Sequence, residues 1–397
     1  MPPLTSNRAR SLQPSLIRRV AEAAMSRDDV IPLWFGEGCW PTSEIAVNAA
    51  NASLRAGNHF YQPNSGSPTL RDTIASYHES KYNVPIDRDR ITVTASGMQG
   101  LTIVAQALVD PGDQCVVVGP TWPNIIEVLR IVGGNVHVRS LQSGESGWHL
   151  DVEALLSDIT AHTQLVFINS PNNPTGWVMS AGDQQRVLDH CRRTGTWIVA
   201  DDVYARLAFD ADVAPSFAAL ASVGDQVICV NSFSKAWSMT GWRLGWITAP
   251  ASLEAPFAML NEFNIASPAG FIQAAGEAML RNGEDEVAAL RSRLATLRSL
   301  VTERLSATPG ITYTEPAGAF YAFFGIGGMT DSVQCARELI ERCGVGLAPG
   351  RAFGAEGEGF LRLCFAQKTD VLEAALDKLC HTVSLLGIDP EDTFPKE

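Results

Sequence analysis

Hydrophobic and polar positions alternate along most of the chain in a way that predicts buried strands and helices in turn. Short apolar runs bounded by turn residues predict strands, and longer segments with apolar residues three or four positions apart predict helices. The expected strands lie at 90–95, 115–118, 135–139, 165–169, 196–201, 226–231 and 244–248. The expected helices lie at 69–82, 98–109, 124–132 and 180–193. Apolar strands separated by helices indicate a mostly parallel central sheet that is buried on both faces.

The pattern changes after residue 283. A long helix with one apolar stripe is expected at 284–306. The elements expected after it are strands at 312–313 and 319–324, a helix at 333–343 and a strand at 361–365. Residues 1–45 look irregular apart from an amphipathic stretch at 16–24. We therefore expect an α/β chain with a large domain at 46–290, and a smaller α+β domain formed by 1–45 and 291–397.

Composition and charge restrict the classes of partner. The chain has 397 residues, 46% of them hydrophobic, and a formal net charge of −13. Such a charge repels nucleic acid and anionic membranes, although a local group of donors can still bind a small anion. The eight cysteines are scattered without a CxxC pair, and no apolar run has the length of a membrane span. We expect a cytoplasmic protein with reduced thiols, no metal site, and neither nucleic acid nor membrane as a partner.

A lysine follows one of the predicted strands directly, in the segment Ser232-Phe233-Ser234-Lys235. Ligands of open α/β sheets bind at the carboxyl ends of the strands, where this lysine can form a Schiff base with an aldehyde. Ser232, Ser234 and, eight residues after the lysine, Arg243 are suitable donors for a phosphate group. The spacing predicts an aldehyde cofactor that carries a phosphate. The alternative is a surface lysine in a polar turn.

Further polar or aromatic residues follow other predicted strands. Asp201 ends the strand at 196–201, where a buried carboxylate needs a cation such as a protonated pyridine nitrogen. Asn173 lies in a turn with two prolines and a glycine, and its amide can donate to a phenolate or a carboxylate. Residues 96–98 begin a predicted helix, which makes them an anion site, and Trp122 could stack on a flat ring. Each motif also has an ordinary structural explanation as a helix cap, a turn or a core residue.

Taken together, these segments resemble the class I and II aminotransferases, the aspartate aminotransferase superfamily of fold type I pyridoxal phosphate enzymes. The resemblance runs from Gly36-Glu37 to the strand that holds Arg362, and its specific parts are the block from Lys235 to Arg243 and the segment 172–176. It implies a large domain with a mostly parallel sheet, a smaller α+β domain, and pyridoxal 5′-phosphate as the cofactor. It also implies that Lys235 holds the cofactor and carries the proton, with Asp201 at the pyridine nitrogen. The other residues that it assigns to the cofactor are Asn173 and Tyr204 at the ring hydroxyl, Trp122 on the ring face, and Ser96, Gly97, Met98, Ser232, Ser234 and Arg243 around the phosphate.

The resemblance extends to the substrate and to a second subunit. Arg362 matches the arginine that clamps the substrate α-carboxylate, together with Asn173. Tyr61 matches a tyrosine that reaches the phosphate in the neighbouring subunit, which implies a homodimer with shared active sites. The usual Gly-Glu-Pro is here Gly36-Glu37-Gly38, so Gly38 and the Cys39-Trp40 pair after it alter the expected substrate entrance. Met98 also replaces the small residue expected in the phosphate turn.

These residues predict ping-pong transamination between an L-amino acid and a 2-oxo acid. A C–S lyase or a cyclopropane-forming synthase would use the same cofactor and the same motifs, because fold does not fix the reaction. A non-catalytic regulator that senses an amino acid is a weaker alternative, since only about 45 residues precede the repeating pattern. The sequence does not identify the amino donor. No second arginine is placed to bind a side-chain carboxylate, and Trp34, Phe35 and Trp40 fit either an apolar substrate pocket or the core.

Overall fold

The computed structural model describes residues 5–144 and 147–385. Among these residues, seven strands form the main sheet, in which β10 runs antiparallel to both of its neighbours and the other paired strands run parallel. In order across the sheet they are β2 (Ile91–Thr94), β10 (Gly245–Thr248), β9 (Val227–Ser232), β8 (Trp197–Asp201), β7 (Thr163–Asn169), β3 (Gln114–Gly119) and β4 (Asn135–Ser140). The predicted mostly parallel sheet is confirmed.

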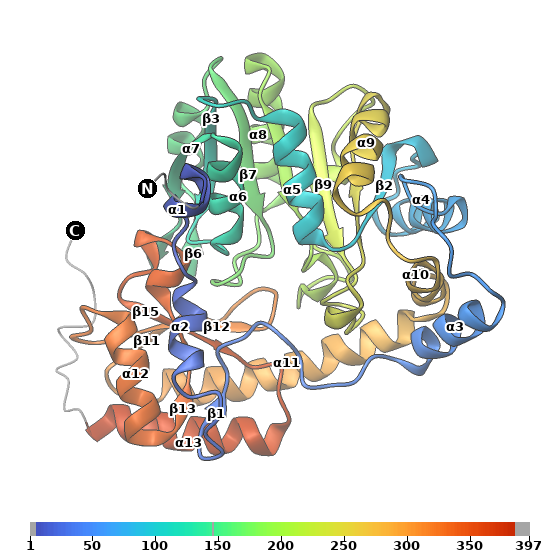
Figure 1. Cartoon of the computed structure of the whole chain (residues 1–397). Coiled ribbons are helices and arrows are strands. Elements are labelled where there is room, and N and C mark those ends of the chain that lie inside the picture. The colour runs from blue at the N-terminus through green and yellow to red at the C-terminus, as the bar shows by residue number, and fades with distance from the viewer. Residues whose placement is uncertain (1–4, 145–146, 386–397) are drawn as a thin grey trace.

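Helices cover both faces of this sheet (Figure 1). Successive strand residues point to opposite faces, so Leu165 and Phe167 of β7 join one apolar cluster, whereas Val166 and Ile168 join the other. The first cluster includes residues of α5 (Gly97–Leu108), α6 (Asn124–Val132) and α9 (Glu254–Ile265). The second includes residues of α7 (Val152–Asp158) and α8 (Ala181–Thr194). Beside them, α4 (Pro68–Tyr82) packs against β2. The double covering explains why the strands are apolar along their whole length.

A smaller sheet lies at one end of the long helix α11 (Glu284–Ser306), which runs from the smaller part of the molecule beneath the larger one (Figure 1). Its strands in order are β11 (Ile311–Tyr313), β12 (Tyr321–Ile326), β15 (Phe360–Cys364) and β14 (Ala348–Pro349). The helices of this part are α12 (Ser332–Cys343) and α13 (Thr369–Leu385). The N-terminal segment joins it, because β1 (Ile31–Pro32) pairs with β13 (Val345–Gly346) and α2 (Leu16–Glu22) packs against β14. These contacts support the proposed division into 46–290 and a smaller domain of 1–45 with 291–397.

Several elements were not predicted. They are the helices α1 (Asn7–Ser11), α3 (Glu44–Arg55), α7, α9, α10 (Gly270–Asn282) and α13, the short strands β1, β13 and β14, and the hairpin of β5 (Gln142–Gly144) with β6 (Gly147–His149). The expectation that 1–45 is irregular is therefore wrong where α1 lies and where α3 begins. Helix α3 packs on α10, and its buried residues are Ala46 and Ala50. Strand β12 begins two residues later than the predicted 319–324.

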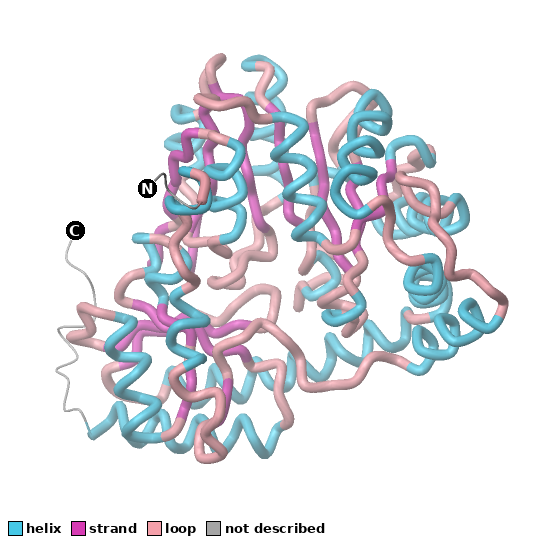
Figure 2. The backbone as a smooth tube through the Cα atoms, in the orientation of Figure 1, coloured by secondary structure: helices cyan, strands magenta, loops and turns pink. Residues whose placement is uncertain are grey.

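The loops at one edge of the main sheet face the smaller sheet (Figure 2). The strands β7, β8 and β9 end at this edge, which is where open α/β sheets bind ligands. Short 3-10 helices lie at Arg88–Arg90, Ala205–Leu207, Phe217–Ala219, Thr240–Trp242, Ala251–Leu253, Gly350–Phe353 and Ala355–Gly357. Of the helices in the described part of the chain, none has both the length and the apolar character that crossing a bilayer requires.

Candidate active site

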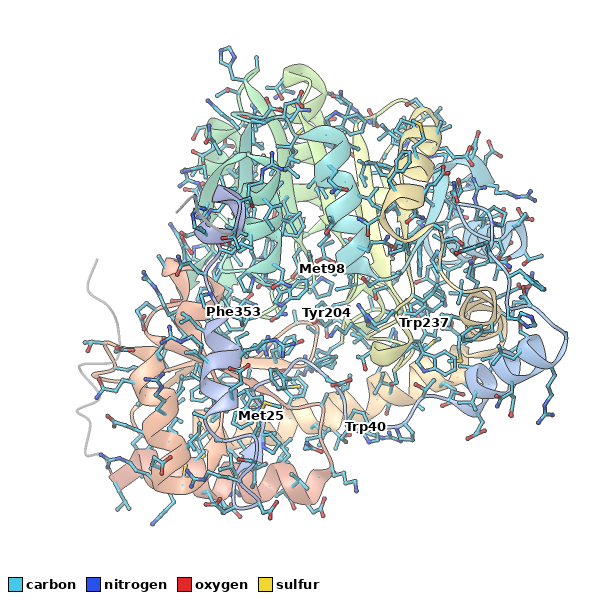
Figure 3. The ribbon with its side chains drawn as sticks, in the orientation of Figure 1. Met25, Trp40, Met98, Tyr204, Trp237 and Phe353 are labelled. Carbon is cyan, nitrogen blue, oxygen red and sulfur yellow. The ribbon has the colours of Figure 1, made fainter. Side chains whose placement is uncertain are left out.

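A cavity of about 280 Å³, here called the central cavity, lies between the carboxyl ends of β7, β8 and β9 and the smaller sheet. Figure 3 shows Met98 at the start of α5, with Tyr204 below it in this region. The predicted site residues that line the cavity are Gly97, Met98, Trp122, Asn173, Asp201, Tyr204, Ser232, Ser234, Lys235, Arg243 and Arg362. The lining residues that were not predicted as site residues are Ile17, Phe35, Gly36, Leu101, Asn169, Val203, Thr240 and Tyr321.

Lys235 lies three residues after β9, with its side chain half-buried at the cavity wall. Its Nζ donates a hydrogen bond of 2.6 Å to the carbonyl oxygen of Gly36, which belongs to the N-terminal segment. The Tyr204 and Phe320 rings lie 5.7 and 5.8 Å from the same nitrogen. Burial, together with the nearby guanidinium groups of Arg362 and Arg243, lowers the pKa of Lys235 to about 8. A large fraction of this amine is therefore neutral near pH 8 and available as a nucleophile or a base.

Asp201 ends β8 and is 5% exposed. One carboxylate oxygen accepts a hydrogen bond of 3.2 Å from the Val203 backbone N–H. Burial, with a smaller contribution from the neighbouring Asp202, raises the pKa of Asp201 to about 7. Asp202 is buried as well, but its carboxylate accepts from the Ser216 hydroxyl at 2.6 Å, and it does not line the central cavity. Of the two carboxylates, Asp201 is the one that a cation in the cavity could approach.

A chain of hydrogen bonds links the end of β8 to the smaller sheet. The Asn169 Nδ2 atom donates to the Asp201 carbonyl oxygen at 3.0 Å, and the Asn169 Oδ1 atom accepts from the Asn173 backbone N–H at 2.8 Å. The Asn173 side chain then accepts from Arg362 Nη1 at 2.8 Å. The turn that follows β7 is held by Asn172, whose Oδ1 accepts from both the backbone and the hydroxyl of Thr175. This turn fixes Asn173 between Asp201, which is predicted at the pyridine nitrogen, and Arg362, which is predicted to bind the substrate carboxylate.

Arg362 on β15 is 2% exposed and lies between two aromatic rings. Its guanidinium carbon is 4.4 Å from the centroid of Tyr321 and 4.7 Å from that of Phe353. Besides the bond to Asn173, its Nη2 donates to the Trp34 carbonyl oxygen at 2.5 Å. Its Nε is buried and has no hydrogen-bond partner among the residues that the structure describes. A buried donor without a partner is costly, so the arrangement fits an anion that is bound at Arg362 in the complex.

Hydroxyl, guanidinium and amide donors gather at the start of α5 and the end of β9. The Ser232 hydroxyl donates to the Ser234 hydroxyl at 2.9 Å, and Arg243 Nη1 lies 3.5 Å from the same Ser234 oxygen. The first amides of α5 have no acceptor within the helix, and the positive end of the helix dipole lies there. A Cβ atom on Gly97 would come within 3.2 Å of the Ser232 Cβ, so glycine permits this close approach. The cluster has the composition of a phosphate site.

Two tyrosines meet beside Lys235. The Tyr204 and Tyr321 hydroxyl oxygens are 2.7 Å apart, and both side chains are buried. A Cβ atom at Gly36 would lie 2.1 Å from the Tyr321 oxygen, so only glycine fits beneath this hydroxyl group. Sequence reasoning missed Tyr321 as a site residue, although it lies inside a predicted strand. The position of Tyr321 at the cavity becomes apparent only from the pairing of β12 with β15, the strand that carries Arg362.

Three predicted site residues lie outside the central cavity. The Ser96 hydroxyl caps α5 by accepting from the Gln99 backbone N–H at 3.0 Å. Gly38 lines an adjoining cavity of about 240 Å³, which shares Lys235 with the central one. Tyr61 is 89% exposed and borders neither of these two cavities in the described chain.

The family model described as aminotransferase class I and II matches residues 28–379. An aspartate aminotransferase from Pyrococcus horikoshii is 31% identical over 368 residues, which cover 92% of this chain and 93% of that protein. An arginine–pyruvate transaminase from Pseudomonas aeruginosa is 31% identical and is matched over 91% of each chain. The solved structure of an aromatic aminotransferase from P. horikoshii has a TM-score of 0.86 at 28% identity, covering 94% of this chain and 99% of that one. The resemblance inferred from the motifs is confirmed: the chain belongs to the class I and II aminotransferase family, an α/β family of pyridoxal phosphate-dependent transferases.

Proposed function

We propose that the protein is an aminotransferase in which Lys235 holds pyridoxal 5′-phosphate covalently and Arg362 binds the α-carboxylate of the amino acid. The observation that carries this proposal is the convergence of one half-buried amine, one buried carboxylate and one buried guanidinium group on a single cavity. Each of these groups is ionisable, and the surroundings shift the pKa of Lys235 and of Asp201 toward neutrality.

The residues of the cavity fit this cofactor. Asp201 is a buried carboxylate with a raised pKa, which a protonated ring nitrogen would return to the ionised form. Ser232, Ser234 and Arg243 supply donors for a phosphate beside the first amides of α5. The remaining cofactor contacts that we propose are Asn173 and Tyr204 at the ring hydroxyl, Trp122 on the ring face, and Gly97 and Met98 through their backbone N–H groups at the phosphate. We assign Ser96 to this group only through its capping of α5.

When bound, the cofactor supplies an aldehyde that joins the amino nitrogen and a ring that delocalises the charge left at Cα. Lys235 moves the proton that leaves Cα, because its lowered pKa keeps a fraction of the amine neutral near pH 8. Arg362 holds the substrate carboxylate through donors that include its unpaired Nε, which fixes the Cα–H bond relative to Lys235. Asp201 holds the ring nitrogen in its protonated form. The same residues bind a 2-oxo acid in the return half-reaction.

An ordered but exposed apolar patch supports the proposed homodimer. Its residues lie on the loop before Asn64 and on α9: Phe60, Tyr61, Met259, Phe263 and Ile265, of which Tyr61 is 89% and Phe263 84% exposed. The Asn64 backbone and side chain bond to Asn261 and Glu262 of α9 at 2.7 and 3.0 Å, so the loop is tied down without being covered. Exposed apolar patches of this kind mark interfaces. We propose that a second copy covers the patch and that Tyr61 completes the phosphate site of the partner subunit.

We also propose a reducing, cytoplasmic location. All eight cysteines are free, and burial raises the pKa of several of them, Cys115 and Cys191 to about 12. Thiols with raised pKa values are poorly reactive, as expected of core residues.

The test is a half-reaction screen with protein reconstituted with the cofactor. Each common L-amino acid is added alone, and the visible absorption band of the lysine-bound cofactor is followed. We expect some amino acids to bleach the band and a 2-oxo acid to restore it. Release of pyruvate or ammonia without amination of the cofactor would instead identify a lyase and refute transamination.

A further inference from the structure

Two buried tyrosine hydroxyl groups meet at the wall of the central cavity, one from each of the two proposed domains. Tyr204 follows β8 of the main sheet by three positions, whereas Tyr321 begins β12 of the smaller sheet. Their oxygens are 2.7 Å apart and their ring planes are 78° apart, so the rings meet edge to face while the hydroxyl groups share a hydrogen bond. Both side chains line the cavity.

This pair of hydroxyl groups holds one more proton than its shared bond uses. Burial raises the pKa of both phenols above the usual value, so each oxygen carries its proton at neutral pH. Along the described chain, neither hydroxyl group has a second hydrogen-bond partner. A hydroxyl group has a single proton, so the tyrosine that donates to a ligand in the cavity must accept from the other one.

The surroundings of the two rings decide which tyrosine is the inner member of the pair. The Tyr204 ring lies 5.7 Å from the Lys235 Nζ atom, and the Asp201 carboxylate is close enough to contribute to its raised pKa. The Tyr321 ring instead covers the Arg362 guanidinium group at 4.4 Å, and Gly36 leaves room for its hydroxyl group. Tyr204 therefore faces the residues proposed to hold the cofactor, and Tyr321 lies behind it.

We infer that Tyr321 is a positioning residue, which donates its proton to the Tyr204 oxygen so that Tyr204 presents its own proton to the ring oxygen of the cofactor. The inference rests on the proposed function, which places Tyr204 at that oxygen. A hydroxyl group that accepts one hydrogen bond becomes a stronger donor in the next, because the two bonds polarise each other. Without the Tyr321 hydroxyl group, Tyr204 remains a donor but a weaker one.

The pKa of the lysine-bound cofactor reports on this relay without any turnover. Its visible absorption band changes when the nitrogen that joins it to Lys235 loses a proton, and a negative charge on the ring oxygen favours keeping that proton. A hydrogen bond donated to the ring oxygen stabilises the negative charge and lowers this pKa. Removing or weakening the donor should raise the pKa.

The test is a pH titration of this band in the cofactor-loaded protein and its variants. Tyr321→Phe keeps the ring on Arg362 and removes only the hydroxyl group, and we expect it to raise the pKa by about 0.3 unit or more. Tyr204→Phe removes the inner donor and should raise the pKa by about one unit or more. Tyr313→Phe is the matched control and should leave the pKa unchanged. Tyr313 lies on the neighbouring strand β11 with its hydroxyl group 3.2 Å from that of Thr302, and it does not line the central cavity.

The double variant distinguishes a relay from a structural effect of losing the hydroxyl group. When Tyr204→Phe is already present, Tyr321→Phe should cause no further rise in the pKa, because the oxygen to which it donates is gone. No rise in Tyr321→Phe alone, or an equal rise with and without Tyr204, would overturn the inference.

The same titration separates this inference from the proposed function. If no amino acid converts the band, transamination fails as a function, but the pKa shifts still decide the role of Tyr321. If the protein forms no lysine-bound band with the cofactor, the proposed function and the inference are both refuted.

Discussion

The unpaired donor of Arg362 leads to a sharp prediction for the substitution Arg362→Lys. The arginine already donates to Asn173 and to the Trp34 carbonyl oxygen, and its Nε has no acceptor in the described part of the chain. Lysine keeps the charge but has a single nitrogen, which cannot reach both protein acceptors and a ligand together. A hydrogen bond to a charged group contributes about 1.5–3 kcal/mol, so losing the second donor to a carboxylate should cost about 3 kcal/mol.

That loss corresponds to a decrease in kcat/KM on the order of 100-fold, since each tenfold factor is about 1.4 kcal/mol. Half-reaction kinetics over a range of amino acid concentrations measure it directly. The absorption band of the bound cofactor should be unchanged, because Lys235, Asp201 and the Ser232–Arg243 cluster all lie in the proposed large domain. We also expect a lower Tm, since Asn173 or the Trp34 carbonyl group loses its donor.

Arg298→Lys is the matched control. Arg298 also has a buried Nε without a partner in residues 5–144 and 147–385. Its guanidinium carbon lies 4.3 Å from the Phe209 ring centroid, but it does not line the central cavity. The substitution should lower Tm in a similar way and leave kcat/KM within about twofold of the original. The reasoning would be refuted if Arg362→Lys reacted within about threefold of the unmodified protein, or if both variants lost activity equally.

Three further outcomes follow from the geometry. Lys235→Ala should abolish the half-reaction while leaving the circular dichroism spectrum intact, because the described lining offers no second amine; substantial turnover would contradict the proposed mechanism. Asp201→Asn should make the Tm of cofactor-free protein fall less between about pH 4 and pH 7. Burial raises the Asp201 pKa from 3.8 to about 7, so the stability that this group contributes is present below pH 3.8 and is lost as the pH rises through 7. An unchanged Tm profile would argue against that burial. Phe263→Asp should give monomers in sedimentation velocity, whereas Val223→Asp, at an apolar residue that is 88% exposed outside the patch, should not; equal dissociation of both would contradict the proposed interface.

The residues that sequence reasoning brought to the cavity share a simple property. Asp201 and Ser232 are the last residues of β8 and β9, and Asn173 follows β7 by four positions. Parallel strands in one sheet bring their carboxyl ends to one edge, so a correct reading of the strands already places these side chains together. The motifs around Lys235 then identify which chemistry this edge performs.

The rest of the cavity depends on packing that a single sequence does not reveal. Ile17, Phe35 and Gly36 reach the cavity because β1 pairs with β13, more than 300 residues later in the chain. Tyr321 enters it through the pairing of β12 with β15. Helices α3 and α10, which were also missed, pack on each other.

The net charge of the central cavity is opposite in sign to the net charge of the whole protein. The chain carries a net charge of −13, yet the described lining of the central cavity holds Lys235, Arg243 and Arg362 against Asp201 alone. Mutual repulsion of these cations is part of the reason that the pKa of Lys235 falls to about 8. A phosphate and an α-carboxylate would offset this excess of positive charge, because both groups are anionic.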